Sequence, residues 1–165
     1  MLRIGIVAVA ALALSSCGFR PLYAEATGDV AQQLSEIAVA EIPSPEASGF
    51  LVQKELTRRL SAPADIGSAT WDLEVKVEES KSPFAIQIDA SVTRFDYELI
   101  GVYKLTNRIT GVVHESTARA AASYNVLNSQ FATLAAEQEA REKAARLLAE
   151  RIQLDIALKL ADLEG

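Results

Sequence analysis

Cysteine and histidine are almost missing from this chain of 165 residues, which has one of each. A single cysteine excludes an internal disulfide bond. The same scarcity leaves almost nothing from which to build a zinc site or a catalytic triad around His114. Glycine-rich phosphate-binding loops are also missing. We therefore predict no enzyme, no catalytic residues and no metal site, although a hydrolase built on two carboxylates stays open as an alternative that no pattern marks.

Positive charge and long apolar runs are also scarce. The chain has 16 Lys and Arg against 22 Asp and Glu, and its formal net charge is −6 at pH 7. This sign disfavours a nucleic-acid partner. The one marked apolar run, Ile4–Leu14, is too short to cross a bilayer, and no later stretch is longer. Contact with a membrane would therefore need a lipid anchor or a protein partner.

Residues 1–16 have the parts of a secretory signal peptide, with Arg3 ahead of the apolar run. The run ends in Leu14-Ser15-Ser16-Cys17, which resembles a bacterial lipobox, the motif at which a signal peptidase cuts. Cys17 would then carry diacylglycerol and an N-acyl chain, and several acyl chains hold a protein at a membrane almost permanently. Gly18 follows Cys17. An Asp at this position is the usual signal for retention in the inner membrane. Because Gly18 stands there instead, sorting to the outer membrane is favoured. An ordinary signal peptide with an incidental cysteine is the alternative.

The mature chain is long enough for one core, which we place at residues 34–165, after a lipidated N-terminus and polar tether at 17–33. A first strand is predicted over Leu34–Ile42, since prolines follow it. Apolar residues spaced by four then predict an amphipathic helix from Ser48 or Gly49 to Leu60.

The centre of the chain has the period-two alternation of half-buried strands. Trp71 to Val77 form the first such segment, and a second apolar face, on even-numbered residues, runs from Phe84 to Val92. The apolar phase then moves to odd numbers, which predicts a bulge or loop near Thr93 and Arg94. Val112–Tyr124 returns as another strand. We expect four strands, mostly antiparallel.

A long helix is predicted over Ser129–Leu163, about 50 Å at 1.5 Å per residue. Four pairs of opposite charge lie four residues apart in it: Glu137 with Arg141, Glu139 with Lys143, Glu142 with Arg146, and Asp155 with Lys159. Its apolar stripe is widened by Leu147, Leu154 and Leu158. This excess would be buried either against a partner or within the domain itself.

Several short motifs together resemble one known family. They are Cys17-Gly18-Phe19-Arg20-Pro21-Leu22-Tyr23, Tyr103-Lys104-Leu105 with Thr110-Gly111, and Ser123-Tyr124-Asn125-Val126-Leu127 leading into Phe131–Glu137. In order and spacing they resemble the LPS-assembly lipoprotein LptE family, in its alphaproteobacterial form. The resemblance implies an α+β two-layer sandwich with two helices on one face of a four-stranded sheet. It also implies an outer-membrane lipoprotein subunit on the periplasmic side. There it assembles and plugs the LptD β-barrel from within the lumen and aids LPS insertion into the outer leaflet.

A plug needs a polar surface opposite its core. That side of the predicted strands carries Gln87, Asp89, Ser91, Thr93, Asp96, Glu98 and Lys104, interrupted by Ile100 and Val102. If LPS is bound directly, its phosphates call for Lys or Arg. The candidates are Lys81, Arg94, Lys104 and Arg108. For each of them an ordinary solvated charge is the alternative, and it is favoured by the usual exposure of these residue types.

A different class of function also fits the sequence. A periplasmic lipid-binding auxiliary lipoprotein of an intermembrane lipid transporter would share the size, anchor and α+β core. The two hypotheses differ in partner. The plug predicts a one-to-one complex with a barrel, and the lipid-binding protein predicts an apolar pocket.

Overall fold

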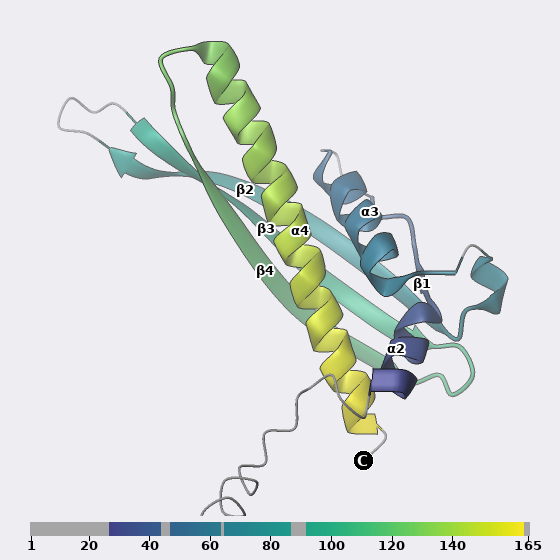
Figure 1. Ribbon diagram of the computed structural model, residues 1–165. Helices are drawn as coiled ribbons and strands as arrows, with labels where there is room; N and C mark the ends of the chain where they lie inside the picture. Colours follow the sequence, from purple (N-terminus) through teal and green to yellow (C-terminus); the bar gives the residue numbers. More distant parts are fainter. Residues whose placement is uncertain (1–26, 44–46, 64, 87–91, 164–165) are drawn as a thin grey trace, which may run out of the picture.

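The computed structural model describes residues 27–43, 47–63, 65–86 and 92–163 (Figure 1). The predicted signal peptide, Cys17, and the outer-side residues Gln87, Asp89 and Ser91 lie outside the described residues. The elements in chain order are α2 (Thr27–Ser35), β1 (Ile37–Val39), α3 (Ser48–Leu60), the 3-10 helix η1 (Ile66–Ser68), β2 (Trp71–Ile86), β3 (Val92–Asn107), β4 (Val113–Asn125) and α4 (Gln130–Leu163).

The strands form one four-stranded sheet in the order β1-β2-β3-β4. The pairs β2–β3 and β3–β4 are antiparallel, and the short β1 is parallel to β2. Helices α3 and α4 lie side by side on one face of this sheet (Figure 1). The predicted α+β class, with four mostly antiparallel strands and a long C-terminal helix, is therefore confirmed.

The region before the sheet differs from the prediction. Residues Thr27–Ser35 form helix α2, where the polar composition predicted a tether as far as residue 33. Leu34 packs against the core from this helix, and α2 contacts α4. The strand predicted over Leu34–Ile42 is correspondingly reduced to β1, whose three residues pair only with Trp71, Asp72 and Leu73. Tertiary contact with α4 overrides the weak local signal here.

The break between β2 and β3 also falls earlier than predicted. β2 ends at Ile86 and β3 begins at Val92, whereas the alternation placed the break near Thr93 and Arg94. The pairing register already shifts between Pro83 and Ile86. Pro83 has no backbone N–H to donate to a ladder, so it favours an irregular strand end.

The inner face of the sheet, which α3 and α4 cover, is built by alternation. Its buried residues are Trp71, Leu73, Val75 and Val77 of β2, Tyr97, Leu99, Tyr103 and Leu105 of β3, and Ala118, Ala120, Ala122 and Tyr124 of β4. The small alanines of β4 let α4 approach closely. At Gly101 a Cβ would lie 3.3 Å from both Ile152 Cδ1 and Leu148 Cδ2. The absence of a side chain there therefore brings the helix down onto β3.

Helix α4 buries Ala140, Ala144, Ala145, Leu148, Ala149, Ile152, Ile156 and Leu160. Of the four predicted charge pairs within it, only Glu137–Arg141 comes within 4 Å, at 3.7 Å. Ion pairs between solvated side chains contribute little free energy, which explains why the charged groups of the other three pairs lie more than 4 Å apart. Among the described residues, no helix has the length and apolarity needed to span a membrane.

Candidate functional site

The face of the sheet opposite the two helices is the first candidate surface. We call it the outer face. It comprises Asp72, Glu74, Lys76, Glu78, Ser80 and Ser82 of β2, Arg94, Asp96, Glu98, Ile100, Val102, Lys104 and Thr106 of β3, and Val113, Glu115, Thr117, Arg119, Ala121, Ser123 and Asn125 of β4. No described helix or strand covers these residues.

Charges of both signs alternate across the outer face. Glu74, Lys104 and Glu115 lie in one row across three strands, and Lys104 Nζ is 3.0 Å from Glu74 Oε2. The predicted apolar interruption is also present, since Ile100 and Val102 lie on this face and the side chain of Val102 is 46% exposed. The outer face is thus mixed in charge, with a small apolar centre.

The four predicted LPS-contact residues do not converge on one site. Arg108 is held at the β1 end of the sheet, where Nε and Nη2 donate to Asp72 at 2.9 and 2.6 Å. Its Nη1 donates to the carbonyls of Ile66 and Ala69 at 2.7 and 3.0 Å. The hydrogen bond from Arg108 lowers the pKa of Asp72. Arg108 therefore holds η1 against the sheet. Lys104, a second candidate, forms an ion pair with Glu74.

The other two candidates lie towards the opposite end, on opposite faces. Lys81 Nζ is on the inner side, 3.2 Å from Glu137 Oε1, and this contact raises the pKa of Lys81. Arg94 is on the outer face, with its guanidinium 5.3 Å from the centre of the Phe84 ring. Of the four, only Arg94 has no carboxylate partner among the described residues. Within the described ranges, the positive charge of Arg94 is thus not neutralised by an ion pair.

A polar network beneath α4 was missed by the sequence analysis. Tyr97 OH donates to Glu79 Oε2 at 2.6 Å and accepts from Arg141 Nε at 2.9 Å. Ser48, at the start of α3, hydrogen-bonds to Glu79 and lies 2.8 Å from Tyr97 OH. Burial raises the pKa of Tyr97, and the bond to Glu79 adds to the effect. Glu79 is the next residue in the alternating series of Trp71 to Val77 and is charged where an apolar residue is expected. This interruption is the sequence signal that could have indicated a buried polar contact.

A second, partly buried contact joins the sheet to α4 further along the helix. Tyr103 OH and Ser116 Oγ both donate to Asp155 Oδ2, at 2.6 and 2.7 Å. The bond from Tyr103 lowers the pKa of Asp155, and burial raises the pKa of Tyr103. Both networks hold α4 at a defined position along the sheet.

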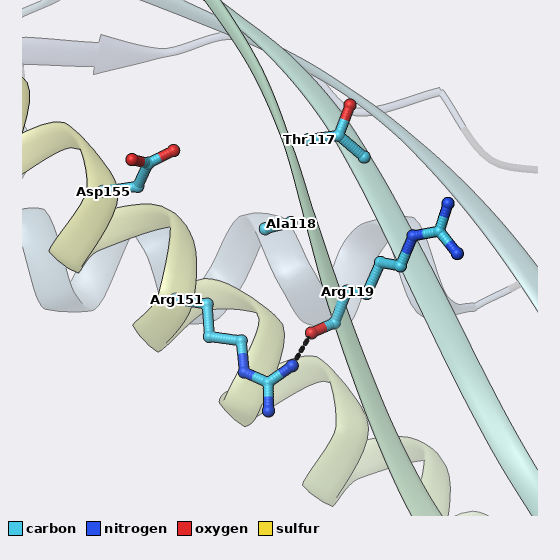
Figure 2. Close-up of a pocket in the computed structure, with 5 residues that line it drawn as sticks. All are labelled: Thr117, Ala118, Arg119, Arg151 and Asp155. Carbon is cyan, nitrogen blue, oxygen red and sulfur yellow. Dashed lines mark hydrogen bonds between the residues drawn. The ribbon is translucent and has the colours of Figure 1, made fainter.

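Two hollows open beside this helix, along its seam with β4. Figure 2 shows the larger, of about 550 Å³, which is lined by Thr117, Ala118, Arg119, Arg151 and Asp155. Arg151 Nη1 donates there to the main-chain carbonyl of Arg119. The smaller, of about 270 Å³, lies by Ser123–Asn125 and includes Glu139 and Lys143 of α4.

His114, the one histidine of the chain, is not part of a metal-ligand cluster among the described residues. His114 lies with its ring 6.5 Å from that of Trp71, and its buried Nε2 has no hydrogen-bond partner. In the described ranges no three His, Cys, Asp or Glu side chains come together as metal ligands. The networks at Tyr97 and Tyr103 instead link the sheet to the helices. They have a structural role, and the outer face is the candidate for partner binding.

Comparison with known proteins defines the class of fold. No protein-family model and no curated protein sequence matches the chain. Among solved structures it is similar to a protein from Caulobacter crescentus CB15 assigned as a lipoprotein, with 25% identity and a TM-score of 0.68. That match covers 83% of this chain and 98% of the other.

Two further lipoproteins share the fold. Rare lipoprotein B from Shewanella oneidensis is 13% identical with a TM-score of 0.56, over 78% of this chain and 97% of that one. An uncharacterised lipoprotein B from Nitrosomonas europaea is 13% identical with a TM-score of 0.55, over 76% and 83%. The chain therefore has a fold that is found in bacterial lipoproteins.

Proposed function

We propose that this chain is an outer-membrane lipoprotein of the LptE type. In this proposal Cys17 carries the lipid anchor, and the folded domain sits in the lumen of an LptD-like β-barrel. There it assists assembly of the barrel, plugs it and aids insertion of LPS into the outer leaflet. The single observation that carries the proposal is the outer face, an uncovered sheet surface of mixed charge on a lipoprotein fold.

The dimensions and chemistry of the outer face suit a barrel lumen. β2 has 16 residues, which correspond to about 50 Å at 3.3 Å per residue. That length exceeds the roughly 25 Å apolar band of an outer-membrane barrel, whose interior is polar. Rows such as Glu74, Lys104 and Glu115 place both signs of charge next to each other. Such a face complements a polar wall without a strong net repulsion.

Direct LPS contact is a secondary part of the proposal. Lys81, Lys104 and Arg108 already neutralise carboxylates, so a phosphate would have to displace Glu137, Glu74 or Asp72. Among the described residues, Arg94 contacts the Phe84 ring and no carboxylate. We therefore assign the phosphate contact first to Arg94, next to exposed apolar surface provided by Phe84.

The alternative, a lipid-binding auxiliary lipoprotein, calls for an enclosed apolar site. The two hollows described beside α4 are open and are lined partly by Arg151, Asp155, Glu139 and Lys143. Acyl chains gain little from charged surroundings of this kind. No specific observation therefore favours that alternative over the plug.

The test is capture of the full chain through a C-terminal tag from membranes of its native host in mild detergent. We expect one large outer-membrane barrel in equal amount. Inner-membrane transporter subunits, or bound lipid without a barrel, would overturn the proposal. Cys17→Ser should remove acylation and reduce membrane attachment, while Ser16→Ala is the matched control beside the modified residue. If Cys17→Ser chains still carry acyl mass, the assignment of the anchor is wrong.

A further inference from the structure

We propose that the free edge of β4, together with the facing side of α4, binds an extended segment of the barrel partner as a fifth strand of the sheet. This inference rests on the proposed function for the identity of the partner. It adds a second contact, distinct from the outer face, and it states the chemistry of the segment that fits.

The main-chain hydrogen bonds of β4 to β3 involve every second residue of the strand. Asn107 N donates to Val112 O at 2.8 Å, and Val126 N donates to Thr93 O at 2.9 Å. Both pairs obey the same antiparallel register, in which even-numbered residues of β4 bond with β3. The odd-numbered residues, from Val113 to Asn125, therefore direct their N–H and C=O groups away from the sheet. This row is what an added strand recognises.

The β4 edge lacks two common protections against pairing, a proline and a β-bulge. The strand is 13 residues long, is last in the sheet and contains neither proline nor glycine. Arg151 shields one carbonyl, that of Arg119, by donating to it from α4 (Figure 2). No other outward group between Glu115 and Ser123 has a recorded main-chain partner within the described residues.

One side of α4 runs along this edge. The two hollows place Thr117 and Arg119 beside Arg151 and Asp155, and Ser123 and Asn125 beside Glu139 and Lys143. Leu147 lies midway on the same helical stripe and is partly buried against the core. Residues four apart on a helix advance about 6 Å. Alternate residues of a strand advance about 6.7 Å, so the two rows stay nearly in step over three positions.

The charges on this stripe select the segment. Lys143 and Arg151 flank Leu147, and Lys143 is absent from the ion pairs between described residues. The segment that fits therefore presents an acidic, an apolar and an acidic side chain at alternate positions towards α4. When the segment binds, Arg151 gives up its hydrogen bond to the Arg119 carbonyl and pairs with a carboxylate of the segment. The Arg119 carbonyl can then accept a hydrogen bond from the new strand. A second copy of this chain would instead offer Ser116, Ala118 and Ala120, which carry no acid.

The experiment measures amide exchange of the full chain, residue by residue, free and in the captured complex. We expect the outward amides of Glu115, Thr117, Arg119 and Ala121 to slow by roughly 100-fold or more in the complex, because they gain hydrogen bonds. Amides of even-numbered residues, such as Ala118 and Ala120, are already bonded to β3. They serve as the internal control and should change much less.

Two substitutions test the backbone and the charge separately. Thr117→Pro removes one outward N–H and no ladder bond to β3, so it should lower the yield of partner, whereas Thr117→Val keeps the N–H and should not. The double change Lys143→Glu and Arg151→Glu should lower the yield about tenfold. Arg146→Glu is the matched control, because it also replaces a positive charge by a negative one, at an exposed residue of α4 outside this stripe.

The outcomes separate this inference from the proposed function. A barrel complex in which the outward amides exchange as fast as in the free chain would overturn the fifth strand and leave the plug intact. Protection by a different protein would support the strand contact to that protein's segment and overturn both the barrel assignment and the proposed function. Protection that depends on a second copy of the chain, or no partner at all, would overturn the inference as stated.

Discussion

The inner face of the sheet is covered by α3 and α4, whereas the outer face is covered by no helix or strand in the described part of the chain. The same three strands supply both faces through alternate residues. On the inner face Leu73, Leu99 and Leu105 are fully buried. On the outer face their chain neighbours are charged or hydroxylated, except for Ile100. One face holds the fold together, and the other is available to a partner.

The comparison teaches that stability and recognition are separated by strand periodicity. A substitution on the inner face changes the free energy of unfolding because it alters packing against α4. A substitution on the outer face should change partner binding and leave stability nearly unaltered. The predictions below test this separation, starting with the largest expected effect.

Ile152→Ala should give the largest loss of stability. Ile152 is fully buried and packs over Gly101, so the truncation leaves a cavity between α4 and β3. We expect the free energy of unfolding to fall by about 2–5 kcal/mol. Denaturant unfolding followed by circular dichroism measures it. Val102→Ala on the outer face is the control and should stay within about 0.5 kcal/mol; equal losses in both variants would contradict the separation.

Tyr97→Phe should rank second. It removes the hydroxyl that joins Glu79, Ser48 and Arg141, and leaves their buried groups with fewer partners. The expected loss is about 1–3 kcal/mol. The same unfolding measurement on Glu79→Gln, which keeps an acceptor oxygen, should show a smaller loss. If Tyr97→Phe is as stable as the parent chain, the network does not hold α3 and α4 to the sheet.

Asp155→Asn should change the pH dependence of stability. The hydrogen bond from Tyr103 lowers the pKa of Asp155. A lowered pKa contributes stability that is complete above the ordinary value of about 3.9 and is lost as the pH falls through the folded value. The parent chain should therefore exceed the variant at pH 7, and the difference should shrink below about pH 4. Melting temperatures at pH 7, 5 and 3 measure it; a constant difference would argue against this assignment.

The loss of stability at high pH tests the contact between Tyr103 and Asp155 independently. Burial raises the pKa of Tyr103, so its contribution is complete below the ordinary tyrosine value of about 10 and is lost as the pH rises towards the folded value. Tyr103→Phe should remove this part of the alkaline destabilisation. Melting temperatures at pH 8 and pH 11 test it, with Tyr23→Phe, outside the described residues, as a substitution of the same kind.

Lys104→Ala should have the smallest effect on stability. Its ion pair with Glu74 is partly exposed on the outer face, where such pairs contribute about 0.2–1 kcal/mol. A double-mutant cycle with Glu74→Ala measures that coupling. We expect the yield of captured barrel to fall in the charge-reversed variant Lys104→Glu while its melting temperature stays close to that of the parent. A large loss of stability would show that the outer face also supports the fold.

Much of this architecture was predictable because it depends on local patterns. The alternation at Trp71 to Val77 determined which residues of β2 face the core. The four-residue spacing of Val52, Leu56 and Leu60 determined α3, whose end at Leu60 is as predicted. The start of α4 was predicted within one residue of Gln130. A period of two or of 3.6 is visible without any knowledge of the partner element.

The predicted candidate residues illustrate the limit of this approach. The sequence indicates Lys81, Arg94, Lys104 and Arg108 as candidate phosphate partners, yet three of them have carboxylate partners. Two of those carboxylates, Asp72 and Glu137, lie 36 and 56 residues away from their cations in the chain. The sequence shows that a charge is present, but its neutralisation depends on which strands and helices lie side by side.

The periodicity of each element, the two faces of the central strands and the length of the last helix thus follow from local sequence patterns. Long-range packing was needed to make β1 parallel, to make Thr27–Ser35 helical, and to bring Ser48, Glu79, Tyr97 and Arg141 together beneath α4. It also decided which edge of the sheet is left without a partner. Local patterns record how a segment divides apolar from polar surface. The choice among distant partners follows from the packing of the whole chain, where long-range contacts must offset the entropy of closing the loops between them.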